Sequence, residues 1–406
     1  MKHTARPLSI YLVAGEESGD ALGAALIRAL LARNDYTFEL AGIGGRSMAE
    51  AGIASPFPID DLSIIGLGEI PRRLPKILRR IRQAADAIVA RRPDVLVIID
   101  SPDFTHRVAR RVRRLAPAIP ILDYVSPSVW AWRPGRARAM RHYIDGVLAI
   151  LPFEPAAHVK LGGPPCLYVG HPLIERLADL RPNPEEARRR LADPAVVLVL
   201  PGSRAGEVRR HLDIFGAAIE RVAARMGPLD LVLPTLPHLA ATVREGIAGW
   251  PQQPRLIVEP EEKWAAFRTA RAALAASGTV TLELALAGVP SVAAYRLPIV
   301  EEIVVRLAGI KGRLHSVILA NLILEENVVP EYLQRDCTPQ RLADALVPLL
   351  SDGPERKRQI EAFARLDQIM GVGGETPSAK AAAIVLDAAR GGRRVANPKS
   401  AKKASA

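Results

Sequence analysis

Two short segments in the first part of the chain place carboxylates beside glycine or proline. GEESGD begins at Gly15, and DSPDF begins at Asp100. A carboxylate partly withdrawn from water has a raised pKa and can take a proton from a reacting hydroxyl group. We therefore consider Asp100 a candidate general base, whereas Asp103 fits a functional role and a helix cap equally. Ser18 and Asp20 could likewise cap the helix that follows GEESGD.

Two later loops have the form expected of an anion-binding site. PGSR begins at Pro201 and SGTVTLE begins at Ser277, and each lies between an apolar run and a predicted helix. Glycine permits close backbone approach and the first amides of a helix bind anions, so both loops suit a nucleotide diphosphate. Arg204 could add a charge-assisted contact or simply be a surface residue. Glu283 could accept the hydroxyl groups of a ribose or only complement the helix dipole.

Neither loop matches the Walker consensus, which argues against ATP hydrolysis, and GEESGD is not a dinucleotide fingerprint.

The segment SPSVWAWR, which begins at Ser126, holds two of the four tryptophans. An indole beside Arg133 can form a platform for a sugar ring or a lipid headgroup, and hydrophobic packing of the loop is the alternative. His171, within GHP at 170–172, could contact substrate or be a packed structural residue.

The elements that must position these motifs are short apolar runs separated by helical segments. Such runs without alternation indicate parallel strands buried on both faces, and ligands of such sheets bind at the carboxyl ends of the strands. The sequence therefore predicts an α/β fold of two Rossmann-like, doubly wound halves. The expected strands are 8–14, 38–42, 95–99, 119–125 and 147–151 in the first half, and 196–200, 229–234, 255–258, 272–276 and 291–294 in the second.

Composition narrows the class of protein. The 406 residues exceed one typical domain, and 49% hydrophobic with 24% charged residues is a globular balance. Two cysteines form no disulfide framework, and the chain shows neither a signal peptide nor an uninterrupted apolar stretch of spanning length, so we expect a cytoplasmic protein. The formal charge of +12 suits nucleic acid, an anionic membrane or phosphorylated substrates, although a high arginine content in a GC-biased genome explains it equally.

Segment 61–82 combines isoleucines and leucines with five arginines and one lysine. A basic amphipathic segment is typical of a membrane interface, and Ile64, Ile65 and Leu67 precede the expected helix in a loop-like stretch. The alternative is a helix that packs on the core with a solvated cationic face.

In this order, the motifs resemble the lipid A disaccharide synthases, inverting glycosyltransferases of lipid A biosynthesis. The matching segments are AGEESGD (14–20), DSPDF (100–104), SPSVWAW (126–132), LPFE (151–154), VGHP (169–172), PGSRAGE (201–207), SGTVTLE (277–283), LANL (319–322) and VPEYLQ (329–334). The resemblance implies the GT-B fold, two Rossmann-like domains with an interdomain cleft. The implied domains are 1–172 on the acceptor side and 173–375 for the UDP-sugar, with a helix at 376–390 returning to the first domain. Segment 391–406 is basic and poor in apolar residues, so its composition predicts a disordered tail.

The resemblance also implies the reaction. UDP-2,3-diacylglucosamine donates its sugar to 2,3-diacylglucosamine 1-phosphate, which gives a β-1,6-linked disaccharide 1-phosphate and UDP, with no metal or other cofactor. Asp100 would be the base, with Glu16 as its competitor. The remaining implied site residues are Ser18, Asp103, Trp130 and His171 for the acceptor, and Arg204, Ser277, Gly278, Thr279, Glu283 and Asn321 for the donor.

The resemblance also suggests a homodimer. Peripheral contact with the cytoplasmic face of the inner membrane is an inference from segment 61–82 and from the acyl chains of the implied substrates, and we expect no nucleic-acid partner. One alternative is another GT-B enzyme, such as a UDP-sugar epimerase or a lipid-linked N-acetylglucosaminyltransferase, against which SPSVWAW and GEESGD argue. The other is a basic nucleic-acid-binding protein, which would need exposed aromatics beside its basic clusters, and aromatic residues are only 4% of this chain.

Overall fold

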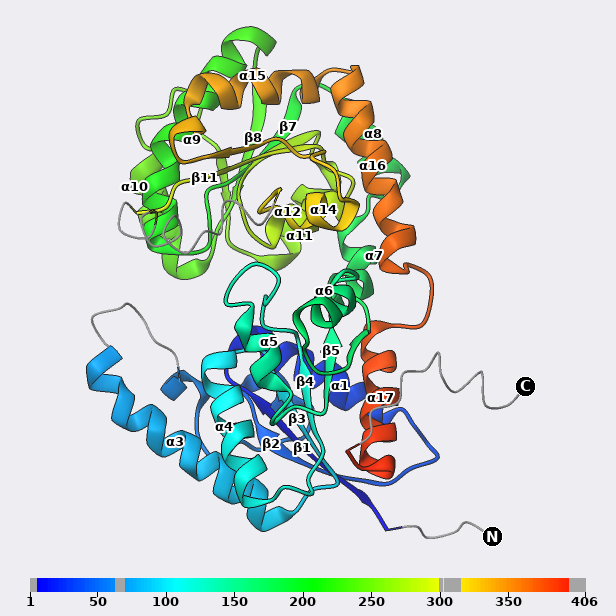
Figure 1. Ribbon diagram of the computed structural model, residues 1–406. Coiled ribbons are helices and arrows are strands. Elements are labelled where there is room, and N and C mark those ends of the chain that lie inside the picture. Colours follow the sequence, from blue (N-terminus) through cyan, green and yellow to red (C-terminus); the bar gives the residue numbers. More distant parts are fainter. Residues whose placement is uncertain (1–5, 63–69, 299–301, 303–314, 394–406) are drawn as a thin grey trace. The chain divides into compact units, whose positions relative to one another are not determined.

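Twelve strands in the described part of the chain form two parallel sheets of six (Figure 1). The structure is a computed structural model, and it describes residues 6–62, 70–298, 302 and 315–393. The chain divides into two units. Unit 1 comprises Met1–Pro172 and Gly373–Ala406, and unit 2 comprises Leu173–Val372. No helix within the described ranges combines the length and the hydropathy needed to cross a membrane.

The sheet of unit 1 has the strand order β2-β1-β3-β4-β5-β6. Its strands are β1 (Leu8–Ala14), β2 (Phe38–Ile43), β3 (Val95–Ile99), β4 (Ile121–Tyr124), β5 (Gly146–Ala149) and β6 (Cys166–Tyr168). Its helices are α1 (Glu17–Leu31), α2 (Arg46–Glu50), α3 (Ile70–Arg91), α4 (Pro102–Leu115), α5 (Gly135–Met140), α6 (Glu154–Leu161) and α17 (Pro377–Gly391).

Both faces of this sheet are buried, as the unalternating apolar runs predict. Tyr11 and Val13 of β1 pack into one core with α3 and α4. Ile10 and Leu12 of the same strand point to the opposite face and pack against α1 and α17. Because α17 supplies Val385 to that second core, the end of the chain returns to unit 1, beside α1 (Figure 1).

The sheet of unit 2 has the order β12-β11-β10-β7-β8-β9. Its strands are β7 (Ala195–Leu200), β8 (Leu229–Pro234), β9 (Arg255–Ile257), β10 (Ala272–Ala276), β11 (Ser291–Tyr295) and β12 (Glu331–Leu333). The helices of this unit are α7 (Leu177–Leu180), α8 (Pro184–Leu191), α9 (Ala205–Met226), α10 (Ala240–Ile247), α11 (Pro260–Thr269), α12 (Val280–Leu286), α14 (Leu319–Leu324), α15 (Pro339–Leu350) and α16 (Pro354–Met370).

The two doubly wound sheets confirm the predicted fold class, and all ten expected strands are present within a few residues of their predicted ends. The three-residue strands β6 and β12 at the sheet edges were not predicted. Neither has the long apolar run of a central strand, since every residue of both is only half-buried. The tail from 394 onward, together with Ile64, Ile65 and Leu67, lies outside the described residues.

Candidate active site

The polar motifs of unit 1 lie at the point where the strand order of its sheet reverses. β1 pairs with β2 on one side and with β3 on the other, so the loops after β1 and β3 diverge from neighbouring strand ends. Such a switch point is where ligands bind to open parallel sheets. GEESGD follows β1 and DSPDF follows β3, and the structure therefore brings Glu16, Ser18 and Asp100 together.

The carboxylate of Asp100 is held by two hydrogen bonds. The backbone amide of Ser101 donates to Oδ1 at 2.7 Å, and the hydroxyl of Ser18 donates to Oδ2 at 2.7 Å. Asp100 and Ser101 both have left-handed backbones, with φ values of 52° and 47°, which is costly for residues with a Cβ and is typical of functional sites. The hydroxyl of Ser101 also donates to Glu16 at 3.2 Å, which links the two candidate bases.

Two glycines allow the loop after β1 to approach Asp100 this closely. A Cβ on Gly15 would lie 2.7 Å from the hydroxyl oxygen of Ser101, and one on Gly19 would lie 2.9 Å from the carbonyl oxygen of Ile99. Real Cβ atoms essentially never come so near. The glycines of GEESGD are therefore explained by the contact between the two loops.

The expected capping of α1 is wrong. The N-cap of α1 is Glu16, and no side chain accepts a hydrogen bond there. Asp20 is instead buried and receives the amides of Gly45, Ser47 and Met48, all at 2.7–3.0 Å, so it stabilises the start of α2. Ser18 is exposed, and its hydroxyl donates to Asp100 and not to the start of α1.

The tryptophans of SPSVWAW divide between the two predicted roles. Trp130 packs edge-on against Phe153, with ring centroids 5.0 Å apart, and its Nε1 donates to Glu154 at 3.3 Å. Trp132 is 40% exposed and carries the guanidinium of Arg133 4.6 Å from its ring centroid. Thus the platform of indole and arginine forms at Trp132, while the predicted contact residue Trp130 belongs to the packing.

Glu154, which sequence reasoning left out of the site, is the anchor of this loop. Its second carboxylate oxygen receives the amide of Leu151 at 3.0 Å, and burial raises its pKa to about 7. The sequence could have indicated this role, because Glu154 is the last residue of the LPFE motif.

His171 is buried as well, and burial lowers its pKa to about 4, so the imidazole is neutral at physiological pH. Asp103 lies on the first turn of α4, exposed, with Oδ1 3.4 Å from Arg136.

The donor-type loops of unit 2 lie at the corresponding switch point. β7 pairs with both β8 and β10, so PGSR after β7 and SGTVTLE after β10 leave neighbouring strand ends. The amides of Gly278, Thr279 and Val280 form no hydrogen bond with another residue of the described ranges. Ser277 is half-buried and donates its own amide to Ala294 at 3.0 Å. The loop after β10 therefore offers free amide donors at the start of α12.

Glu207 organises the PGSR loop and was not predicted to do so. Its carboxylate accepts the amide of Ser203 at 3.1 Å, the guanidinium of Arg204 at 2.9 Å and the hydroxyl of Tyr295 at 2.9 Å. Burial raises the pKa of Glu207, but these hydrogen bonds outweigh it and lower the pKa overall. Gly202, at φ 129°, leaves room for this carboxylate, since its Cβ would lie 2.7 Å from Cβ of Glu207.

The side chain of Arg204 is 81% exposed, so a ligand can reach it beside Glu207. Glu283, on the first turn of α12, is mostly buried and pairs with Nζ of Lys263 at 3.0 Å. Lys263 in turn lies 4.1 Å from the ring centroid of Trp264. Lys263 was not predicted, because nothing in its sequence neighbourhood distinguishes it from other surface lysines.

The predicted donor contact of Asn321 is not supported by its surroundings. The side chain is fully buried, and its amide nitrogen donates to Ser316 and to the carbonyl of Val329 at 3.2 and 2.9 Å. Its oxygen accepts the amides of Val328 and Val329 at 3.0 and 2.9 Å. Every hydrogen-bonding position of the side chain is thus used internally, and Asn321 holds the loop between α14 and β12 in place.

The motifs lie in loops at the strand ends of two parallel sheets, and comparison with known proteins shows the family. A family model for lipid-A-disaccharide synthetase matches residues 10–385. The chain belongs to the lipid-A-disaccharide synthase family. A lipid-A-disaccharide synthase of Bradyrhizobium diazoefficiens is 58% identical over 385 residues, which cover 95% of this chain and 97% of that protein. One from Rhodospirillum centenum is 45% identical, with 94% and 95% covered.

Solved structures share the fold at low sequence identity. A putative UDP-N-acetylglucosamine 2-epimerase from Listeria monocytogenes superposes with a TM-score of 0.63 and 14% identity, covering 95% of this chain and 96% of its own. MurG of Acinetobacter baumannii gives 0.55 and 14%, covering 94% and 100%. The predicted GT-B fold is confirmed. Membership of the family makes this chain a glycosyltransferase that forms the lipid A disaccharide.

Proposed function

We propose that the donor is UDP-2,3-diacylglucosamine and the acceptor 2,3-diacylglucosamine 1-phosphate. In the proposed reaction, the 6-hydroxyl oxygen of the acceptor forms a bond to C1 of the donor sugar. The bond between C1 and the diphosphate oxygen breaks, and UDP leaves with the electron pair. The hydroxyl proton passes to the enzyme, and the β-1,6 linkage forms with inversion.

The observation that carries this proposal is the fixed carboxylate of Asp100 at the switch point of unit 1. A general base must be held at a defined position and must have an oxygen lone pair free for the proton. The amide of Ser101 and the hydroxyl of Ser18 each occupy one lone pair on a different oxygen, so acceptor capacity remains on both. We assign proton removal to Asp100. Glu16, linked through Ser101, contributes to the acceptor side.

Unit 2 would bind the UDP moiety. The free amides at the start of α12 and the exposed guanidinium of Arg204 are donors suited to the diphosphate, where negative charge grows as the bond to the sugar breaks. Glu283, positioned by Lys263, is suited to accept the ribose hydroxyls. We propose that these donors stabilise the leaving group without a bound metal or other cofactor, and therefore that a chelator leaves turnover unchanged.

We further propose that the enzyme contacts the cytoplasmic face of the inner membrane through α3. Ile77 of this helix is buried in the core, as the packing alternative predicts, but Leu74 and Leu78 are 40% and 41% exposed. They lie among the cationic side chains of Arg79 and Arg82, an arrangement suited to an anionic interface. A Leu74→Ser, Leu78→Ser variant should bind phosphatidylglycerol vesicles more weakly, whereas Leu191→Ser, at a 69% exposed leucine on α8, should not. Equal losses would contradict this assignment.

The substrates are tested by incubating the purified enzyme with the proposed donor and acceptor. We expect release of UDP in equal amount to a disaccharide 1-phosphate whose linkage is β-1,6. Release of UDP without the acceptor, or a different linkage, would overturn the proposed substrates. The expected homodimer and the expected absence of a nucleic-acid partner stay predictions.

A further inference from the structure

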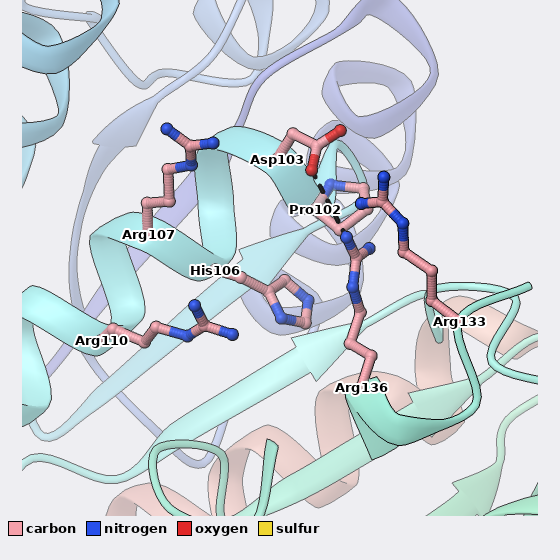
Figure 2. A pocket seen from close by; sticks show the side chains of 7 residues that line it. All are labelled: Pro102, Asp103, His106, Arg107, Arg110, Arg133 and Arg136. Atoms are coloured by element: carbon pink, nitrogen blue, oxygen red, sulfur yellow. Dashed lines mark hydrogen bonds and ion pairs between the residues drawn. The ribbon is translucent and has the colours of Figure 1, made fainter. Parts of the chain in front are cut away.

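A cavity rich in arginine begins at Pro102, two residues after the candidate base in the chain, and has no role in the reaction as proposed above. Its volume is about 210 Å³. α4 contributes one side of its lining, and the segment after β4, leading into α5, contributes the other (Figure 2). The charged and titratable lining residues are Asp103, His106, Arg107, Arg110, Arg133 and Arg136.

The arginines of this cavity carry more positive charge than the protein around them balances. Arg136 has its guanidinium 3.4 Å from Asp103, a contact drawn in Figure 2. Within the described residues, no carboxylate forms an ion pair with Arg107, Arg110 or Arg133. The cavity lining carries four guanidinium groups and one carboxylate, so these five side chains have a net charge of about +3. Arg107, Arg110 and Arg133 are exposed, so water and salt screen part of this charge, and the positive surface that remains attracts an anion.

The wall is also held in place by contacts that are not ionic. The guanidinium of Arg110 donates to the hydroxyl of Tyr143 at 3.1 Å and lies 4.7 Å from the ring centroid. The same hydroxyl lies 3.0 Å from Nδ1 of the buried His106, whose Nε2 is 3.2 Å from the fully buried Asp123. Arg110 is thus backed by a buried polar chain, and a preorganised donor binds an anion with less loss of entropy than a mobile one.

Arg133, on the other side of the cavity, is positioned by its backbone and by the indole of Trp132. Arg133 has φ 51°, a left-handed value that is uncommon for a residue with a Cβ, and its guanidinium lies over the ring of Trp132. Planar guanidinium groups bind phosphate oxygens through paired hydrogen bonds, and several of them together favour a dianion over a monoanion.

The cavity is also in the right place for the acceptor. Pro102, which lines it, is the first residue of α4 and follows Asp100 and Ser101 directly. We propose that this cavity binds the phosphate monoester of the acceptor and so orients the acceptor sugar beside Asp100. The inference rests on the proposed function for the identity of the acceptor. A phospholipid headgroup offers the same phosphate chemistry, but its phosphodiester carries one negative charge, which matches three surplus positive charges less well.

The experiment compares two double variants with two acceptors. Arg107→Gln with Arg110→Gln removes two cavity arginines that have no ion-pair partner among the described residues. Arg114→Gln with Arg138→Gln is the matched control, since it removes two exposed arginines from α4 and α5 that do not line the cavity. The acceptors are 2,3-diacylglucosamine 1-phosphate and the same glycolipid without its phosphate, and the readout is kcat/KM from UDP release at saturating donor.

We expect the cavity variant to lose about 100-fold in kcat/KM for the phosphorylated acceptor, because each charge-assisted contact contributes about tenfold. Its activity on the acceptor without phosphate and its KM for the donor should match those of the unmodified enzyme. The control variant should keep the full preference for the phosphorylated acceptor. Equal losses on both acceptors, or an unchanged preference, would overturn the inference.

Binding to phosphatidylglycerol vesicles separates the two sources of phosphate. A cavity variant that binds these vesicles more weakly but keeps its preference for the phosphorylated acceptor would assign the cavity to a lipid headgroup and contradict the proposal. The proposed function fails in a different way. Absence of transfer by the unmodified enzyme would overturn the acceptor itself, whereas normal transfer with an unchanged preference in the cavity variant would overturn only the inference.

Discussion

The hydroxyl of Ser18 donates a 2.7 Å hydrogen bond to Oδ2 of Asp100, and so joins two loops that are 82 residues apart in the sequence. The bond leaves Asp100 with one carboxylate oxygen oriented by Ser18 and the other by the amide of Ser101. A base held in this way needs no rotation before it accepts a proton. Ser18 is therefore a positioning residue for the proposed base.

Replacing Ser18 by alanine should lower kcat about tenfold. One hydrogen bond to a charged group contributes about 1.5–3 kcal/mol, and we expect only part of this free energy to raise the barrier when Asp100 is less well oriented. The KM for the donor should stay unchanged, because the donor loops lie in unit 2. Steady-state kinetics with both substrates varied measures this. Ser47→Ala on α2, where only the backbone amide is used by Asp20, is the control. A tenfold rise in donor KM with normal kcat would contradict the positioning role.

Gly19→Ala should destabilise the fold by about 1–3 kcal/mol, because the new Cβ would lie 2.9 Å from the carbonyl oxygen of Ile99 and the two loops would have to move apart. Urea denaturation measures the change. Gly135→Ala is the matched control, since a Cβ there meets nothing within 4 Å and alanine suits the helix that begins at that residue. If both variants unfold at the same urea concentration, the close approach of the loops is not what requires Gly19.

Glu283→Gln should weaken UDP binding about tenfold, because the uncharged amide accepts hydroxyl hydrogen bonds less strongly. The loss should depend on the ribose. The unmodified enzyme should bind 2′-deoxy-UDP more weakly than UDP, and the variant should not distinguish them. Calorimetric titration with both nucleotides tests this, with Glu262→Gln on α11 as the control. A variant that still prefers UDP to the deoxynucleotide would assign Glu283 to the support of Lys263 alone.

Stability should depend on pH through Glu154. Burial raises the pKa of this carboxyl group to about 7 in the folded protein, above its usual value of 4.5. The folded state therefore holds a proton that the unfolded chain releases, and stability is greatest below about pH 4.5 and falls as the pH rises towards 7. Glu154→Gln removes this dependence.

We compare the free energy of unfolding of the unmodified protein with that of Glu154→Gln. The difference, unmodified minus variant, should fall by about 3 kcal/mol at most between pH 5 and pH 8. Urea denaturation at both values measures this difference, and contributions of other groups such as His171 cancel. A difference that does not change with pH would mean that Glu154 is ionised in the fold at both values.

The strand order and the motif positions explain how much the sequence could predict. Apolar runs indicated ten of the twelve described strands, and their ends placed Asp100 and Arg204 at the sheet edges where ligands bind. The partners of Asp100 and Glu283 could not be predicted, because Ser18 and Lys263 reach them only in the folded chain. Glu207 lies only three residues after Arg204, so that pair could have been predicted from helical spacing. Asn321 shows the opposite case, a predicted contact that its surroundings do not support. A polar residue within a family motif was assigned to the ligand, although its hydrogen bonds all hold its own loop.

The central claim, that Asp100 removes the acceptor proton, is tested most directly by comparing Asp100→Asn with Glu16→Gln. Asparagine keeps the size of the side chain and can still accept the bond from Ser18, but it cannot take up a proton. At saturating donor and acceptor, kcat of Asp100→Asn should fall about 100- to 10,000-fold with UDP affinity unchanged, and that of Glu16→Gln less than about tenfold. Near-normal turnover by Asp100→Asn, or an equal collapse in Glu16→Gln, would contradict the assignment.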